Sequence, residues 1–230
     1  MDLTRFADEY WERKDDRVDG ARLDVLMAQV PAGSRVLVVD GGPGMLAARL
    51  VERGHEVVMT DLSQHAVGRA QAKGLTAHHL DTDDDPLPFD SHSFDCVISD
   101  SAIEHRYYPE KAVGECARVL RPGGTFVLLV PNIAHWRHRL WLLFGRFPEV
   151  IDGPSDRCHL RLFGASEAKG MVRNAGLKVT GIKGFDSLWV KGLYPKVFRA
   201  PGVRALYRGL TRLRPQFFGR DVILICRRPN

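Results

Sequence analysis

Apolar runs of strand length alternate with amphipathic stretches along the first 130 residues. The runs lie at 35–39, 56–60, 75–80, 94–99 and 125–130, and helix-length segments stand between most of them. This alternation predicts parallel strands joined by right-handed helical crossovers. Two later runs, at 177–182 and 221–226, bring the prediction to a doubly wound, mostly parallel, seven-stranded α/β sheet with helices on both faces.

The strand–helix alternation is interrupted twice in the second half. We predict a single domain over residues 1–230, with a lid or substrate insertion at 133–163 and a basic insertion at 185–219. In the first insertion, four large apolar side chains recur at i, i+4, i+7 and i+8: Trp136, Leu140, Leu143 and Phe144. This stripe predicts either a lid helix packed on the sheet or an amphipathic element that touches lipid or an apolar substrate.

Charge is distributed unevenly. Residues 183–230 hold eleven Lys/Arg against two Asp, whereas the whole chain has a formal net charge of +5. The cations are dispersed among aliphatic residues, including Leu188, Trp189, Val190, Leu193, Tyr194 and Val197, so nucleic acid is not the expected partner. The sequence favours a solvated basic surface, with adsorption to anionic lipid as the alternative.

The compartment is predicted from what the sequence lacks. No apolar run has the length of a membrane span, the N-terminus is charged rather than signal-like, and the four cysteines form no CxxC pair. We therefore expect a cytoplasmic protein without a metal site, with peripheral membrane contact through the basic C-terminal segment as the alternative to a purely solvated surface. The oligomeric state is not predicted.

A glycine-rich loop, Asp40–Gly44, follows the first predicted strand and precedes a helix. Ligands of parallel sheets bind at the carboxyl ends of the strands, and Gly42 and Gly44 let a ligand approach the backbone closely. Asp61 ends the second strand, where a carboxylate can accept hydrogen bonds from both ribose hydroxyls of a nucleoside. The loop also fits the dinucleotide fingerprint, but Pro43 lacks an N–H that a pyrophosphate would use, which disfavours an NAD-type oxidoreductase.

Several short motifs decide between these cofactors. In chain order they are Leu87-Pro-Phe89, Ser93-Phe-Asp95, Glu104-His105, Pro109-Glu110 and Arg118-Val-Leu-Arg-Pro-Gly-Gly124. As a set over residues 20–131, they resemble the class I S-adenosylmethionine-dependent methyltransferases of type 11. The resemblance implies a Rossmann-like fold, S-adenosylmethionine as cofactor and methyl transfer as activity.

The resemblance also assigns cofactor contacts. Asp61 and Leu62 would hold the ribose, Asp81 and Thr82 the adenine, and Gly42 and Gly44 the methionine end, which an N-terminal aromatic residue, Tyr10, would cover. The neighbouring carboxylates Asp83, Asp84 and Asp85 are interpreted as a solvated acidic loop.

One departure from the family pattern D-x-G-x-G-x-G stands in this loop. Val38 takes the place of the family's acid, and Asp40 takes the place of its first glycine. Asp40 either supplies the displaced carboxylate or crowds the methionine end. In the second case the protein would be a degenerate, methyltransferase-like binding module without turnover.

The second half resembles methyltransferases related to methionine-biosynthesis protein W. The likeness rests on Pro131-Asn-Ile-Ala-His-Trp136, Gly145-Arg-Phe147 and Asp156-Arg-Cys-His-Leu-Arg-Leu-Phe163. This resemblance implies no single substrate. The insertion after the fifth strand is placed where it would cover the methyl group, and we expect an oxygen acceptor, rather than a nitrogen, on a small molecule, glycan or lipid-linked compound. A hydroxyl acceptor needs a base, and the candidates are His105, His159 and Glu104, although each histidine could instead be structural.

Overall fold

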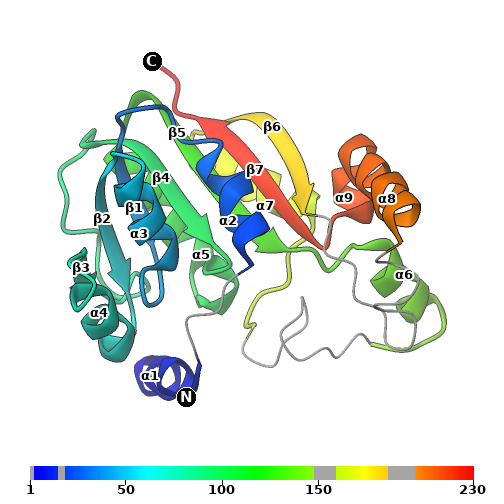
Figure 1. The fold of residues 1–230 in the computed structure, drawn as a ribbon, viewed down its shortest axis with the longest axis horizontal. Coiled ribbons are helices and arrows are strands. Elements are labelled where there is room, and N and C mark those ends of the chain that lie inside the picture. Colours follow the sequence, from blue (N-terminus) through cyan, green and yellow to red (C-terminus); the bar gives the residue numbers. More distant parts are fainter. Residues whose placement is uncertain (1–2, 15–18, 148–158, 186–199) are drawn as a thin grey trace.

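The computed structural model describes residues 3–14, 19–147, 159–185 and 200–230. The strands in these ranges form one seven-stranded sheet in the order β3-β2-β1-β4-β5-β7-β6, and β7 is antiparallel to both of its neighbours. The strands are β1 (Arg35–Val39), β2 (Glu56–Asp61), β3 (Thr76–His79), β4 (Phe94–Asp100), β5 (Leu120–Pro131), β6 (Lys178–Phe185) and β7 (Asp221–Arg227). The predicted mostly parallel sheet is therefore confirmed (Figure 1).

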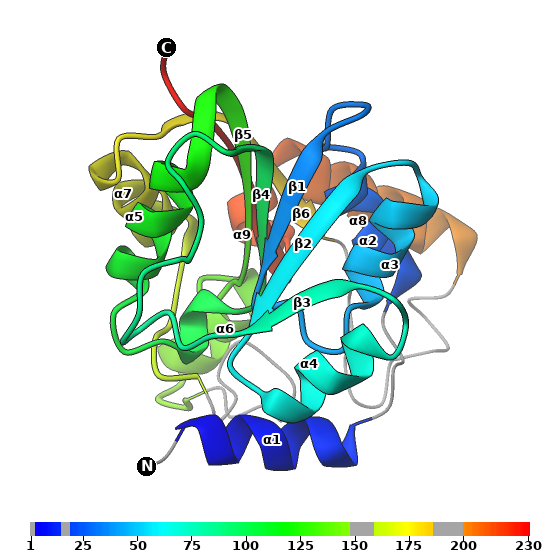
Figure 2. The ribbon, with the colours of Figure 1, turned by 90° about the vertical axis from the view of Figure 1, so that its left-hand side faces the viewer.

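Helices cover both faces of this sheet and also lie along its edges (Figure 1 and Figure 2). They are α1 (Leu3–Arg13), α2 (Gly20–Met27), α3 (Met45–Glu52), α4 (Gln64–Gln71), α5 (Pro109–Val119), α6 (Trp136–Leu143), α7 (Ala165–Asn174), α8 (Pro201–Leu213) and α9 (Pro215–Phe218), with a 3-10 turn at Ile103–His105. Figure 2 shows α5 and α7 on one face, and α2 and α3 on the other.

The core consists of two apolar clusters, one on each side of the sheet. Leu37 and Val39 belong to the cluster on the α5 side, while Val36 and Val38 belong to the cluster under α2 and α3. Successive residues of a strand point to opposite faces, so a strand covered on both sides needs apolar residues at every position. This requirement explains the unbroken apolar run of β1.

Some elements differ from the sequence-based expectation. The helix expected to begin at Arg22 begins at Gly20, because Asp19 caps it by accepting a hydrogen bond from the Ala21 amide at 3.0 Å. Helix α1 was not predicted, and α8 and α9 lie within the predicted basic insertion. None of the helices that the structure describes is long and apolar enough to cross a membrane.

Of the two alternatives for the stripe on α6, packing on the sheet is wrong for its C-terminal half. Leu143 and Phe144 are 76% and 75% exposed. Parts of both insertions, residues 148–158 and 186–199, lie outside the described residues. The sequence-based predictions for Asp156 and for the apolar residues between Leu188 and Val197 therefore lie outside them too.

The fold positions the site at the carboxyl ends of the central strands. Strand order reverses between β1 and β4, which is the point where ligands of doubly wound sheets bind. Helix α1 lies across this edge of the sheet, next to α4 (Figure 2). Its Asp8 accepts hydrogen bonds from Ser63 Oγ at 2.6 Å and from the His65 amide at 3.0 Å, which fixes α1 to the start of α4.

Candidate active site

A pocket of about 360 Å³ opens at the carboxyl ends of β1, β2 and β4. Helix α1, the glycine loop, the end of β2 and the turn after β4 all contribute to its lining. The predicted site residues in that lining are Tyr10, Asp40, Gly42, Asp61, Leu62, Glu104, His105 and His159. Its volume lies in the range of small-molecule sites, roughly 300–1,000 Å³.

The glycine loop is folded tightly against its surroundings. Gly42 and Gly44 adopt φ values of +57° and +82°, and a Cβ on Gly42 would lie 2.6 Å from the Trp11 ring. The amides of Gly41, Gly42 and Gly44 donate to Thr60 O, Asp61 Oδ2 and Gly41 O, respectively. Because these loop N–H groups already have partners, the loop does not match a pyrophosphate-binding loop.

Asp61 forms a buried wall of the pocket. Its Oδ2 accepts from the Gly42 amide at 2.7 Å and its Oδ1 from the Ser63 amide at 2.8 Å, and the residue is 4% exposed. Burial, reinforced by the charge of Asp40, raises the pKa of Asp61 to about 7. Ser63, rather than Asp61, caps α4 by accepting a hydrogen bond from the Ala66 amide.

Asp40 is held by an arginine that the sequence analysis missed. The Arg106 guanidinium is 3% exposed; it forms an ion pair with Asp40 and donates from Nη1 to Asp81 Oδ1 at 2.9 Å. Asp40 has a left-handed φ of +54° and lines the pocket without closing it. A largely buried acid in this loop needs a cation nearby to neutralise its charge, but nothing in the sequence identifies Arg106 as that cation.

The acidic stretch after β3 lies beside the pocket. Asp81 and Thr82 are not among the residues that line it, so the adenine contacts assigned to them stay predictions. The interpretation of Asp83 as solvated is wrong, because Asp83 is 7% exposed. Its carboxylate accepts from the amides of Tyr107 and Tyr108 at 2.9 and 3.0 Å, just before α5, whereas Asp84 and Asp85 are exposed as expected.

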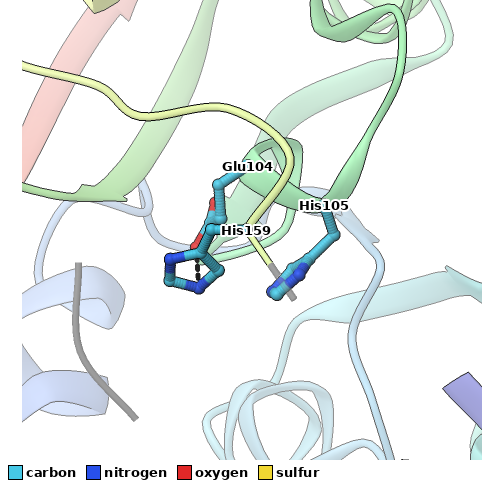
Figure 3. Close-up of side chains that lie close together, drawn as sticks. All are labelled: Glu104, His105 and His159. Atoms are coloured by element: carbon cyan, nitrogen blue, oxygen red, sulfur yellow. Dashed lines mark ion pairs between the residues drawn. The ribbon is translucent and has the colours of Figure 1, made fainter. Parts of the chain in front are cut away.

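The three candidate bases come together at the far end of the pocket. His159 Nε2 lies 3.9 Å from Glu104 Oε1, and the rings of His105 and His159 meet edge to face with centroids 4.8 Å apart (Figure 3). Glu104 is 1% exposed, and within the described part of the chain neither carboxylate oxygen accepts a hydrogen bond. Burial, with the neighbouring acids Asp100 and Asp221, raises the pKa of Glu104 to about 8.

Those two neighbouring acids were also missed by the sequence analysis. Asp100 is paired with Arg22 at 3.1 Å, and burial raises the pKa of both Asp100 and Asp221. All three of these residues line the pocket. They come from α2, β4 and β7, so only the folded chain brings them together.

The Glu104, His105 and His159 side chains also have the composition of a metal site. Among the described residues, their ligand atoms lie within 4.8 Å of one another. Tetrahedral zinc holds its nitrogen and oxygen ligands roughly 3.4 Å apart, as its bond lengths of about 2.0–2.1 Å require. The Glu104–His159 separation of 3.9 Å is wider, so the cluster does not match a preformed tetrahedral site.

Comparison with known proteins identifies the family. Residues 37–128 match the family model described as "Methyltransferase domain". The chain is 32% identical over 168 residues to 2-methyl-6-phytyl-1,4-hydroquinone methyltransferase 2 of Oryza sativa subsp. japonica, covering 65% of this chain and 47% of that protein. It is 36% identical to malonyl-[acyl-carrier protein] O-methyltransferase of Enterobacter lignolyticus, covering 44% of this chain and 41% of that protein.

Solved structures share the fold. The putative methyltransferase in complex with the Haloferax volcanii Trm112 activator superimposes with a TM-score of 0.69 at 22% identity, covering 100% of this chain and 98% of that one. A Mesorhizobium loti S-adenosylmethionine-dependent methyltransferase superimposes with a TM-score of 0.63 at 20% identity, covering 91% of this chain and 98% of that one. Residues 37–128 are a methyltransferase domain of the class I S-adenosylmethionine-dependent type, and this family implies S-adenosylmethionine as cofactor. The chain spans less than half the length of the two curated relatives named above, and its likeness to methionine-biosynthesis protein W stays a prediction.

Proposed function

We propose that this protein transfers the methyl group of S-adenosylmethionine to a hydroxyl oxygen of a small-molecule, glycan or lipid-linked acceptor. The observation that carries the proposal is the composition of one pocket. A glycine loop and the Asp61 carboxylate line one part of it, and a buried carboxylate flanked by two imidazoles lines another.

The residues of the pocket fit this cofactor. Asp61 would accept hydrogen bonds from the ribose hydroxyls with the lone pairs that its two amide partners leave free. The Gly42–Gly44 loop would admit the methionine part, and Tyr10 would cover it from α1. When bound, S-adenosylmethionine supplies an electrophilic methyl group, which is carried on a positively charged sulfur and is transferred to the acceptor oxygen.

The protein's own contribution is to orient the acceptor, exclude water and remove a proton. Holding the reacting groups in line supplies up to ~7–11 kcal/mol in ideal cases. Glu104 would take the proton of the acceptor hydroxyl, because a pKa of about 8 allows it to be partly ionised near neutral pH and to hold a proton afterwards. His159, at 3.9 Å, and His105 would orient the acceptor beside that carboxylate.

The pairing of Asp40 with Arg106 argues against the non-catalytic alternative. That alternative was motivated by an acid at a glycine position of the loop. Arg106 neutralises the charge of Asp40, and the pocket that Asp40 lines is open. The acid at this glycine position therefore leaves room for the cofactor. By their names, one relative methylates a phytylated hydroquinone and the other is an O-methyltransferase of malonyl-[acyl-carrier protein]. The two relatives do not share one acceptor, so a hydroxyl acceptor is proposed from the Glu104 cluster.

The test compares acceptors and variants. The protein is incubated with S-adenosylmethionine and separate pools of alcohols, sugars, hydroquinones and amines, and products that gain one methyl are sought by mass spectrometry. Glu104→Gln should lower turnover by roughly 10²–10⁴-fold while cofactor affinity stays within about twofold. The matched control is Glu110→Gln, an exposed acid on α5 outside the pocket lining, which should behave as wild type. Methylation of amines alone, or full turnover by Glu104→Gln, would contradict the proposal.

A further inference from the structure

Helices α6, α8 and α9 gather at one end of the molecule (Figure 1). Several of their large apolar side chains are exposed. A groove lies between them, lined by Trp136, Leu140, Tyr207, Leu210, Phe217 and Phe218, together with the stem of Arg139. These three helices and their groove are called the α6/α8 face below.

Apolar residues continue from the groove onto the outer surface of both long helices. On α6, Leu143 and Phe144 follow the groove residue Leu140 at i+3 and i+4 and are 76% and 75% exposed. On α8, Leu206 and Leu213 stand four residues before and three residues after Leu210 and are 67% and 77% exposed. Residues three and four apart share one side of a helix, so these side chains border the groove from both walls.

The face is a fixed part of the fold. His135 precedes α6, and its Nε2 atom lies 2.9 Å from the Tyr207 hydroxyl on α8. That hydroxyl donates a hydrogen bond to Phe218 O on α9 at 2.6 Å. The Asn132 side-chain amide donates to Gln216 O and Gly219 O. The buried polar residues of the Pro-Asn-x-x-His-Trp motif therefore hold the three helices together.

Charge on the same helices is of one sign. Ranges 133–147 and 200–220 contain no Asp or Glu, and their exposed arginines are Arg139, Arg146, Arg204, Arg208, Arg212 and Arg214. An apolar surface bordered by exposed arginines is complementary to a bilayer that carries anionic headgroups. It is not self-complementary, because a twofold dimer through this face would set arginines against arginines.

We propose that the α6/α8 face docks on the surface of anionic lipid bilayers. The leucines and Phe144 enter the acyl boundary, and the arginines reach lipid phosphates. The face adjoins the pocket along the chain, since Pro131 precedes α6, Arg220 and Asp221 follow α9, and all three line the pocket. Docking would therefore hold the pocket close to acceptors that reside in the membrane.

The experiment is co-sedimentation of the purified full chain with vesicles of phosphatidylcholine alone or mixed with phosphatidylglycerol, without cofactor or acceptor. Binding should require phosphatidylglycerol and weaken as salt is raised. Leu143→Ser/Phe144→Ser should weaken it at least tenfold, and Arg204→Gln/Arg212→Gln about 30-fold. The matched controls, Val51→Ser on α3 and Arg173→Gln/Lys178→Gln on α7 and β6, remove exposed apolar and basic groups elsewhere and should change it less than twofold.

Several results would overturn the proposal. The protein would fail to bind vesicles that contain phosphatidylglycerol, or it would bind vesicles of phosphatidylcholine alone equally well. The third such result is a loss of binding in the control variants as large as that in the α6/α8 variants. A dimer in sedimentation velocity that the α6/α8 variants dissociate would assign the face to a second copy of this chain instead. Because the assay contains no cofactor, its failure is distinguishable from a failure of the proposed methyl transfer.

Discussion

Replacing Arg106 with methionine should destabilise the protein more than removing an exposed arginine. The guanidinium is 3% exposed and pairs with both Asp40, in the glycine loop, and Asp81, after β3. Methionine has a similar length but no charge. In the variant, two carboxylates would therefore share a largely buried site without a cation.

The size of the effect follows from the burial of these partners. Removing one partner of a buried ion pair costs roughly 3–5 kcal/mol. The Asp81 side chain is 25% exposed, so water screens part of the loss, and we expect about 3 kcal/mol. For a chain of this length, that loss corresponds to a fall in Tm of roughly 6–12 °C.

Urea denaturation followed by circular dichroism measures this difference directly. Arg121→Met is the matched control, because Arg121 pairs with Asp95 at 2.6 Å while the two side chains are 48% and 35% exposed. The control should lose less than about 1 kcal/mol. If Arg106→Met lost no more than Arg121→Met, the assignment of Arg106 as the cation that permits Asp40 in the loop would be refuted.

Three further variants test other parts of the account. Asp61→Asn should weaken S-adenosylmethionine binding roughly 10- to 150-fold in calorimetry, because this range corresponds to the free energy of one hydrogen bond to a charged group. A loss under twofold would contradict the role of Asp61 in binding the ribose. The wild-type affinity should also fall from pH 8 to pH 6 as Asp61, with its pKa of about 7, takes up a proton, and Asp61→Asn should not follow this trend. Folding raises the pKa of Glu104 from 4.5 to about 8, so the folded state binds the extra proton and the free energy of unfolding falls as pH rises between these values. Glu104→Gln should flatten this fall in urea denaturation at several pH values. An unchanged slope would contradict the raised pKa of Glu104. Ser63→Ala removes the cap of α4 and the contact with Asp8, which should lower the free energy of unfolding by about 1 kcal/mol in the same assay, whereas no change would show that the cap is dispensable.

The sheet and part of the site could be predicted from local sequence. Strand β1 is an unbroken apolar run because both faces of the sheet are covered, and Ser63 is recognisable as a helix cap because it directly precedes an amphipathic segment. Asp61 could be placed at the pocket because it ends a strand beside the glycine loop. These inferences depend on neighbours within a few residues.

The remaining features depend on contacts between distant segments. Arg106 lies 66 residues from Asp40, and no periodicity or spacing links the two. Helix α1 takes its place through Asp8 and Ser63, 55 residues apart. Asp83 looks like its exposed neighbours Asp84 and Asp85, yet it is buried because two amides at the start of α5 need an acceptor.

Calorimetric titration of the purified protein with S-adenosylmethionine, S-adenosylhomocysteine and NAD addresses the central claim most directly. The account predicts that the first two ligands bind at one site per chain and that NAD does not bind, since the loop amides are already satisfied. Binding of NAD, or of none of the three, would contradict it.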